Sequence, residues 1–368
     1  MAHSVRHHRL HSASIALTVL LCIVLLNHGT ARIACGQVPK MSAALAGQLR
    51  LIEARVVAGR IVAVSSNVGQ NMSSSSTSNG RRERLSIKLT EAGPTVSYEM
   101  ATAGEQLGFE IVAADRVTLR RQYRTDQGTT TIEFYQIPGR PIVVLTGPSE
   151  ASVKIEAASL WHLFLSEPEL CRQQIVPLMD LIRPDWKVAA MANDIEDQLV
   201  RASKAPVVTD QGAWERWVAE LAASRYSQRQ TADRRLRESG PKVLSFLQRI
   251  DRSRLDTEQS RRVRDIIRSI AGSEEEDTPE RVPLWLADDP RAWYALLARD
   301  DAVKRQMAAE QLARLLKGPI DFDPNATAVT RLAQRAALAK RIEPAGQSIS
   351  DRPAPALPAD APPVVEAK

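Results

Sequence analysis

Histidine and cysteine, which most often carry acid–base, nucleophilic and metal chemistry, are scarce outside the first 36 residues. Five of the six histidines and Cys22 lie in residues 1–36, and Cys35 lies at the end of that segment. His162 and Cys171 are what remains. A Ser-His-Asp, Cys-His or zinc arrangement would therefore have to use His162. Its two large apolar neighbours favour a structural position on a helix instead.

Cys171 is a candidate nucleophile only in electropositive surroundings, because the reactive form of cysteine is the thiolate. Arg172 is adjacent and keeps that alternative open. The neighbouring Leu170 and Ile175 are more typical of a small buried hydrophobic position. We therefore interpret Cys171 as a core residue.

Acidic residues form three further patterns. Two close pairs would serve a hydrolase only across a cleft of suitable width: Glu167 with Glu169, and Asp194 with Asp197. Residues 321–325 (DFDPN) begin like a calcium loop, but alanine and leucine occupy its sixth and twelfth positions instead of glycine and glutamate. The run 274–277 (EEED) is typical of a solvated linker, with a cation or basic partner as the alternative. We predict no catalytic, cofactor-binding or metal-binding residue, and no cofactor.

Positive charge is concentrated in residues 222–270, where thirteen arginines and lysines stand against six acids. On helices, these side chains would line a basic face suited to a protein partner or an anionic envelope polymer. Nearby acids would alternatively pair with them and leave an ordinary solvated face. Few aromatic residues lie between the arginines, so base stacking on nucleic acid is not expected. The predicted partner-binding residues are Arg234, Arg235, Arg237, Arg261, Arg262, Arg264 and Arg268.

Alternating apolar and polar residues predict a β-rich domain over residues 83–150. Leu85, Ile87 and Leu89 alternate with polar residues, and a Gly-Pro turn follows at 93–94. Further short apolar runs, separated by turn residues, continue to about residue 145. This spacing predicts a small antiparallel sheet or sandwich.

From residue 153 the apolar period becomes helical, which predicts an α-helical domain over residues 153–342. Three sequences look like helix starts: Asp289-Pro290, and possible capping boxes at Ser227/Gln230 and Asp256/Gln259. The pattern Arg-Gln-x-Ala-x-x-x-Leu begins at Arg229 and again at Arg305. This offset is close to twice the ~40-residue unit of HEAT-type repeats. We expect an α+β fold, with a small antiparallel β-rich N-terminal domain followed by a HEAT-like α-helical array.

Residues 1–36 have the pattern of a secretory signal peptide. Arg6 and Arg9 give a basic start, and an apolar run at 15–26 precedes small residues at Ala31 and Gly36. The run is shorter than the ~20 residues of a membrane span, so a membrane contact is expected only if the segment is an uncleaved anchor. Cleavage fits after either small residue. We predict an exported protein of the periplasm, cell envelope or medium.

Removing residues 1–36 also changes the charge and the disulfide chemistry. The net charge falls from +6 to +3, so the overall charge gives little reason to expect a nucleic-acid partner. Cleavage after Gly36 leaves one cysteine, which cannot form an intramolecular disulfide.

Two segments are predicted from composition to lack a packed core. Residues 37–82 end in the run SSSSTSNG and are predicted to be a flexible Ser-rich segment, with a possible strand within 51–64. Residues 343–368 are rich in proline and alanine and are predicted to be a disordered tail.

Several motifs together carry a resemblance to a known family: 159–163 (SLWHL), 168–171 (PELC), 183–186 (RPDW), 321–324 (DFDP) and the two Arg-Gln-x-Ala helices. The chain resembles a family of uncharacterised, exported bacterial proteins with a HEAT-like helical C-terminal half. The resemblance covers about residues 83–340. It implies the architecture and no activity or site.

These observations favour a non-enzymatic protein-interaction or scaffold module of the cell envelope. The alternative is a hydrolase that uses a carboxylate pair in a cleft between the β-rich and helical domains. Carboxylates with strongly shifted pKa values in a cleft would favour the hydrolase. An open basic groove would favour the binding module.

Overall fold

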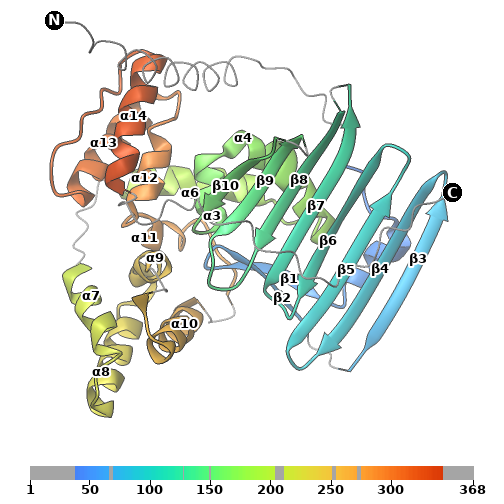
Figure 1. The fold of residues 1–368 in the computed structure, drawn as a ribbon, viewed down its shortest axis with the longest axis horizontal. Coiled ribbons are helices and arrows are strands. Elements are labelled where there is room, and N and C mark those ends of the chain that lie inside the picture. The colour runs from blue at the N-terminus through green and yellow to red at the C-terminus, as the bar shows by residue number, and fades with distance from the viewer. Residues whose placement is uncertain are drawn as a thin grey trace, which may run out of the picture. The chain divides into compact units, whose positions relative to one another are not determined.

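The computed structural model describes residues 38–65, 69–126, 128–148, 151–203, 211–250, 254–271 and 275–342. The expected signal peptide (1–36) and tail (343–368) lie outside these residues. The fold is α+β, with an antiparallel sheet followed by a helical half (Figure 1). The described residues from Lys40 onward fall into one unit by their internal contacts.

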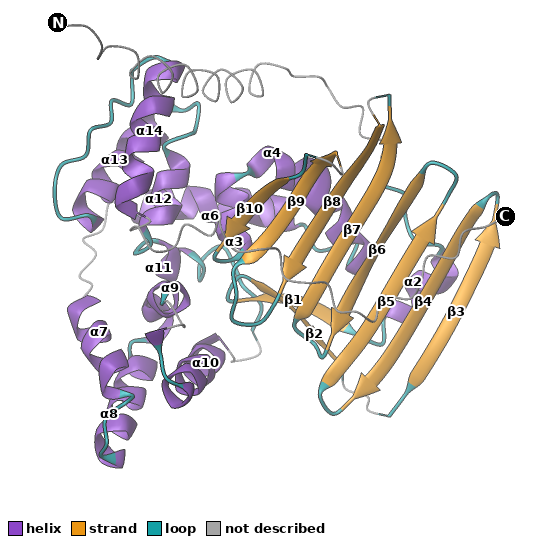
Figure 2. Cartoon of the chain, in the orientation of Figure 1, coloured by secondary structure: helices purple, strands orange, loops and turns teal. Residues whose placement is uncertain are grey.

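Eight antiparallel strands form a sheet in which each strand pairs with its neighbour in the chain (Figure 2). The strands are β3 (Asn71–Ser78), β4 (Arg81–Thr90), β5 (Gly93–Ala101), β6 (Glu105–Val112), β7 (Arg116–Thr125), β8 (Gly128–Gln136), β9 (Ile142–Pro148) and β10 (Val153–Ala157). Because side chains alternate along a strand, every second residue faces the core. In β4 these are Glu83, Leu85, Ile87 and Leu89. The opposite, open face carries mostly polar and charged side chains.

The segment 37–82 is structured in its described part, which corrects the prediction of a flexible linker. It contains α2 (Ala43–Leu49), the hairpin of β1 (Glu53–Val57) and β2 (Arg60–Val64), and β3. The strand expected within 51–64 is thus a two-stranded hairpin. Strand β3 contains five serines and a threonine, yet pairs with β4 along its whole length. Strand pairing uses main-chain groups, so an edge strand does not require apolar side chains.

The hairpin and helix α5 (Val176–Ile182) cover part of the inner face of the sheet. Helix α5 contacts β6 and β7, and β2 contacts β5. The Ser42 N–H at the start of α2 donates to the core-facing Glu83 of β4 at 3.1 Å.

Gln136 of β8 is buried and links the hairpin to the sheet. Its amide nitrogen donates to the carbonyls of Ile61 and Asp115 at 2.7 and 2.8 Å, and its oxygen accepts from the Ile61 N–H at 2.9 Å. The glutamine side chain therefore satisfies both main-chain groups of Ile61, while the Ala63 N–H of the same strand donates to the Ala114 carbonyl at 2.8 Å.

The helical half follows β10 directly, so the sheet extends beyond the predicted boundary at residue 150. Its elements, besides α5, are α3 (Leu160–Ser166), α4 (Pro168–Leu170), the π-helical turn η1 (Cys171–Ile175), α6 (Val188–Ala202), α7 (Gln211–Glu220), α8 (Tyr226–Glu238), the 3₁₀ turn η2 (Gly240–Val243), α9 (Leu244–Arg249), α10 (Thr257–Ala271), α11 (Pro283–Leu286), α12 (Pro290–Leu296), α13 (Ala302–Leu315) and α14 (Ala328–Ile342). Within the described residues, no helix has both the length and the apolar composition that crossing a bilayer requires.

Two of the three predicted helix starts are confirmed. Asp256 and Gln259 form a reciprocal capping box, in which each side chain accepts from the other's main-chain N–H at 2.7 and 3.1 Å. Asp289 caps α12 and is followed by Pro290. The box predicted at Ser227/Gln230 is wrong. Helix α8 begins one residue earlier than Ser227, so the N-cap position falls outside that pair and no side chain caps it.

The repeated Arg-Gln-x-Ala pattern corresponds to a structural repeat of two helix pairs, α7 with α8 and α12 with α13. In each pair, the arginine reaches back to the two carbonyls six and five residues before it: Arg229 to Ala223 and Ser224 at 2.7 and 2.9 Å, Arg305 to Arg299 and Asp300 at 2.7 Å each. The alanine and leucine of both copies are fully buried: Ala232, Leu236, Ala308 and Leu312. Since these carbonyls end the preceding helix or turn, the arginine fixes each pair of helices at its connection.

Candidate functional site

His162 lies between two buried polar groups that come from distant parts of the chain. Its Nδ1 is 2.8 Å from the Oγ of Ser159, and its Nε2 is 3.1 Å from Oδ2 of Asp289. Ser159 is the N-cap of α3, where its side chain accepts from the His162 N–H. Asp289 caps α12 by accepting from the Arg291 N–H at 2.9 Å. The imidazole therefore joins the beginnings of two helices.

Ser159, His162 and Asp289 have the residue types of a hydrolase triad but neither its geometry nor its access. In such triads the serine contacts Nε2 and the acid contacts Nδ1, whereas here the two contacts are exchanged. The exposed fraction of Ser159 and Asp289 is 0%, and that of His162 is 6%. The three groups satisfy one another's hydrogen-bonding capacity inside the core. His162 thus occupies the structural helix position that the sequence predicted.

Cys171 is a fully buried free thiol in the π-helical turn η1. Burial raises its pKa, and the negative charge of Glu167 acts in the same direction. The thiol form is therefore favoured over the nucleophilic thiolate. The interpretation of Cys171 as a small core residue is confirmed.

In the described part of the acidic run 274–277, Glu275 is exposed as a solvated linker predicts, whereas Glu276 is partly buried and Asp277 is buried, which corrects that prediction for these two residues. Glu276 accepts from Nη1 of Arg183 at 2.8 Å and from the indole N–H of Trp186 at 2.7 Å. Glu275 accepts from Arg281 at 2.8 Å. Composition predicts solvation for adjacent acids, but donors from other segments hold Glu276 and Asp277, while Arg281, the partner of Glu275, lies only six residues along the chain. Glu276 joins the segment before α11 to the turn before α6, within the helical half.

Asp277 binds the turn of the β1–β2 hairpin. Its Oδ1 accepts from the Ala58 N–H at 2.9 Å, and its Oδ2 accepts from the Gly59 N–H and from the indole N–H of Trp161, each at 2.6 Å. Ala58 and Gly59 both have positive φ, 50° and 69°. Successive N–H groups in turn conformations converge into a concavity suited to an anion. The carboxylate of Asp277 fills that concavity, which offsets the ~1–2 kcal/mol cost of alanine in the left-handed region.

The turn is also held from its other sides. The Ala58 carbonyl accepts from the side chain of Gln248 at 3.2 Å, and the Gly59 carbonyl accepts from the Leu160 N–H at 2.8 Å. A Cβ on Gly59 would lie 2.5 Å from the Cβ of Ser159, so no larger residue fits there. The hairpin turn is therefore enclosed by α3, α9 and the segment before α11.

Burial is the largest influence on the ionisation of Asp277 and raises its pKa, because the charged form loses hydration. The hydrogen bonds from Trp161, Gly59 and Ala58 oppose this effect, and so does the positive charge of Arg281. A buried acid with a raised pKa is a feature of many active sites, but structural networks produce it as well. The space around the carboxylate decides between these two roles.

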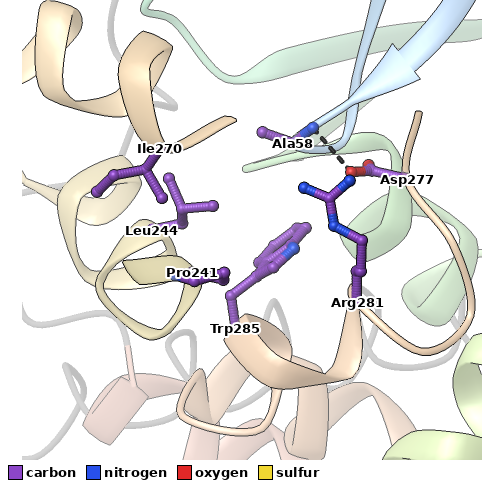
Figure 3. Close-up of a pocket in the computed structure, with 7 residues that line it drawn as sticks. All are labelled: Ala58, Pro241, Leu244, Ile270, Asp277, Arg281 and Trp285. Atoms are coloured by element: carbon purple, nitrogen blue, oxygen red, sulfur yellow. Dashed lines mark hydrogen bonds between the residues drawn. The ribbon is translucent and has the colours of Figure 1, made fainter. Parts of the chain in front are cut away.

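A small pocket lies beside Asp277 (Figure 3). It is lined by Ala58, Pro241, Leu244, Ile270, Asp277, Arg281 and Trp285. In Figure 3, the Arg281 side chain points toward Asp277, and the apolar Leu244 and Ile270 lie on the other side of the Trp285 ring. The pocket volume is about 10 Å³, which holds roughly one water molecule. No organic substrate fits beside the carboxylate in this conformation.

The two carboxylate pairs considered for a hydrolase are absent from the lining of both pockets found among the described residues. Glu169 is exposed and pairs with Arg172, while burial raises the pKa of Glu167. Asp197 pairs with Lys304 at 2.9 Å. A second pocket of about 20 Å³ is lined by Phe164, Pro168, Arg172, Ala189, Ala192, Asn193 and Glu196. Neither this pocket nor the one beside Asp277 is lined by a member of either pair.

The structure brings the predicted arginines together on two helices in contact, α8 and α10. Arg234, Arg235, Arg261 and Arg264 are exposed, whereas Arg237 and Arg262 are partly buried. The side chain of Arg268 lies outside the described part of the chain. Most of these arginines pair with acids on the two helices: Arg234 with Glu238 at 3.7 Å, Arg237 with Asp233, Arg261 and Arg262 with Glu258, and Arg262 also with Asp233 at 3.9 Å.

Arg235 and Arg264 are the exceptions. Arg235 lies over the ring of Trp217, with its guanidinium carbon 5.8 Å from the ring centroid. Arg264 has no ion-pair partner among the described residues. The predicted set is therefore one neighbourhood with much of its charge locally balanced. Such local pairing is what the alternative interpretation from the sequence, an ordinary solvated face, predicted.

No group of three histidine, cysteine, aspartate or glutamate side chains in the described part of the chain is placed to share a metal ion. Comparison with known proteins gives no relative: no family model, curated protein or solved structure matches the chain.

Sequence reasoning missed the partners of His162 and the role of Asp277. Ser159 stands three residues before His162, which is the spacing of a capping contact, so this partner had a local signal. Asp289 is 127 residues from His162, and Asp277 is 218 residues from Gly59. No spacing within the sequence indicates contacts of that length.

Proposed function

We propose that this chain is an exported, non-enzymatic interaction protein of the cell envelope that binds an acidic protein surface through α8 and α10. Export is inferred from the signal-peptide pattern of residues 1–36. The observation that carries the binding proposal is the contact between α8 and α10, which brings exposed arginines of both helices into one neighbourhood. We call the exposed residues Arg234, Arg235, Arg261 and Arg264 the basic face.

The ion pairs within this neighbourhood leave the basic face able to bind a partner. The pairs Arg234–Glu238 and Arg261–Glu258 have side chains that are 42–68% exposed. Such solvent-exposed helix pairs contribute only about 0.3–0.5 kcal/mol each. A carboxylate on a partner can replace the local acid at small cost. Arg264 has no paired local acid among the described residues that a partner would have to replace, and Arg235 is already ordered against the ring of Trp217.

Two observations favour binding over catalysis. The serine, histidine and aspartate that resemble a triad are enclosed in the core. The pocket beside the buried Asp277 holds about one water. A long surface formed by packed helices suits macromolecular recognition better than small-molecule chemistry.

The test is a pull-down from an envelope extract with the chain expressed without residues 1–36. The variant Arg234→Glu/Arg264→Glu reverses two exposed charges, one on each helix. Arg237 and Arg262 are left intact because they are partly buried with Asp233, and reversing them would disturb the packing. The matched control, Arg82→Glu/Arg116→Glu, makes the same charge change at exposed positions of the sheet.

We expect a partner that is retained by the wild type and by the sheet control, lost by the helix variant and released by salt. All variants should show the same circular-dichroism spectrum and melting temperature. Capture of the same proteins by all three chains would overturn the proposal. Salt-sensitive capture of an anionic polysaccharide without protein would assign the basic face to a polymer instead.

A further inference from the structure

Strand β3 forms one edge of the eight-stranded sheet, and no described residue pairs with its outer side. It is eight residues long and reads NMSSSSTS, with no charge, no proline and no glycine. Natural proteins usually protect a free edge with lysine, proline, a bulge or a very short strand. Within Asn71–Ser78, β3 has none of these protections; the bulge at Gly69 and Gln70 lies just before it. The opposite edge, β10, is five residues long and carries the charged Lys154 and Glu156.

The hydrogen-bonding pattern shows which main-chain groups of β3 point outward. In an antiparallel pair, hydrogen-bonded and non-hydrogen-bonded residue pairs alternate. The Leu89 N–H donates to the Gln70 carbonyl at 2.8 Å, so this carbonyl points toward β4. The Leu89 carbonyl accepts from the Gly69 N–H at 2.8 Å, so Gly69 and Gln70 form a bulge opposite Leu89. The register then continues with Met72 opposite Ile87 as the next hydrogen-bonded pair. Even-numbered residues of β3 therefore bond to β4.

The odd-numbered residues consequently direct their N–H and C=O groups away from the sheet. These residues are Asn71, Ser73, Ser75 and Thr77, and all four are exposed. Each of them offers one main-chain N–H donor and one C=O acceptor along the outer edge of β3. Such a row is a template for one more antiparallel strand.

We propose that the partner of this edge is the β3 strand of a second copy of the chain, paired antiparallel about a two-fold axis through Ser74. In this register Asn71 pairs with Thr77 of the second copy, and Ser73 pairs with its Ser75. All four outward residues then form hydrogen-bonded pairs. A register shifted by two residues in either direction leaves one of them without a partner. A shift by one residue is excluded, because it would place outward groups opposite inward ones.

Self-complementarity favours a second copy over a different partner. A two-fold axis brings each strand against itself, and β3 has no charge that would then face a like charge. The same register keeps core-facing residues of both copies on one side, so the two sheets continue into each other. Pairing β3 with β10 of another copy would instead create an open-ended polymer. The charges and shorter length of β10 oppose that arrangement.

Cysteine cross-linking in the full chain tests the register. Cys22→Ser and Cys35→Ser provide the background, and the buried Cys171 stays in place. With the axis at Ser74, its Cα atoms in the two copies form a non-hydrogen-bonded pair about 4.5 Å apart, within the range for a disulfide. We expect Ser74→Cys to give a covalent dimer under mild oxidation. We expect Ser73→Cys and Ser76→Cys to cross-link much less, because each faces a different residue.

Sedimentation velocity of the same chains tests the association itself. We expect the wild type to dimerise at roughly 10–100 µM. Ser75→Pro removes one outward N–H without touching the bonds to β4, and it should weaken the dimer about tenfold or more. Ser75→Ala keeps the N–H and should leave the dimer unchanged. Ser75→Lys, a charge placed on the edge, should weaken the dimer even if the proline variant misfolds.

Three results would overturn the proposal. First, a wild type that stays monomeric over this concentration range would show that β3 does not pair with a second copy. Coverage of the β3 edge by another part of the same chain would give this result. A dimer that is insensitive to both Ser75→Pro and Ser75→Lys places the contact elsewhere. Equal cross-linking at residues 73, 74 and 76 rejects the register.

Discussion

The indole N–H of Trp161 donates to Oδ2 of Asp277 at 2.6 Å, across 116 residues of sequence. The same oxygen accepts from the Gly59 N–H at 2.6 Å. One carboxylate oxygen therefore connects α3, the β1–β2 turn and the segment before α11. All of these donors are buried, so they depend on this carboxylate for their hydrogen bonds.

Replacing Asp277 with alanine should cost roughly 3 kcal/mol of unfolding free energy. The substitution leaves the N–H groups of Ala58 and Gly59 and the Trp161 indole buried without an acceptor. Urea denaturation followed by tryptophan fluorescence measures the change. Asp126→Ala, at an exposed turn position, is the control and should change stability by less than about 0.5 kcal/mol. Equal effects at both positions would show that the contacts to Asp277 carry little energy.

The pH dependence of Asp277 has a defined sign. Burial raises its folded-state pKa above the usual value near 3.8. At pH values between the unfolded-state and folded-state pKa, the native state therefore binds a proton that the unfolded state does not. The stabilisation that comes from protonated Asp277 is fully present below pH 3.8 and is lost as the pH rises through the folded-state pKa. We expect the stability difference between wild type and Asp277→Asn to fall with rising pH and then level off. A difference that grows with pH in this range would contradict the raised pKa.

Glu196 should show the opposite dependence. Burial favours a higher pKa, but the hydrogen bonds and charges of Arg299 and Lys304 outweigh it and hold the pKa below the usual value of 4.5. This contribution to stability is present above pH 4.5 and is lost as pH falls through the folded pKa. We expect Glu196→Gln to lose stability at neutral pH and to approach the wild type in acid. Denaturant titrations from pH 3 to pH 7 compare the two, and a gap that is constant with pH would argue against the paired ionised state.

Ser159 should not react as a catalytic serine. Its Oγ is enclosed, contacts Nδ1 of His162 and caps α3. We expect a fluorophosphonate probe to leave Ser159 unmodified in the folded protein, as judged by peptide mass spectrometry. Ser159→Ala should lower the unfolding free energy by about 1–2 kcal/mol through loss of the cap. Labelling of Ser159 that disappears in His162→Ala would instead reveal an activated nucleophile.

The sheet and the helical half could be predicted because their apolar periods are local properties. Leu85, Ile87 and Leu89 alternate in the sequence and face the core in the structure. Strand β3 could not be predicted this way, because its pairing lies in main-chain groups and its serines are typical of linkers. Its register depends on β4, which composition does not indicate.

The candidate site was predictable only in part. The arginines of α8 and α10 were predicted as one set because they are close in sequence, and the two helices do pack together. Their local ion pairs follow helical spacing and were the alternative interpretation. Asp277 was assigned to a solvated run because its donors, Ala58 and Gly59, are more than 200 residues away. Contacts of that length require knowledge of the tertiary fold.

The long-range attachment of the β1–β2 turn has a consequence for the order of events during biosynthesis. The Ala58 N–H must wait for a carboxylate that is made 219 residues later. At a synthesis rate of about 5–20 residues per second, the turn remains without its anion for roughly 10–45 seconds. The nascent hairpin therefore leaves the ribosome unsecured and docks only when the last third of the chain arrives. Final consolidation of this fold is therefore a late step in folding.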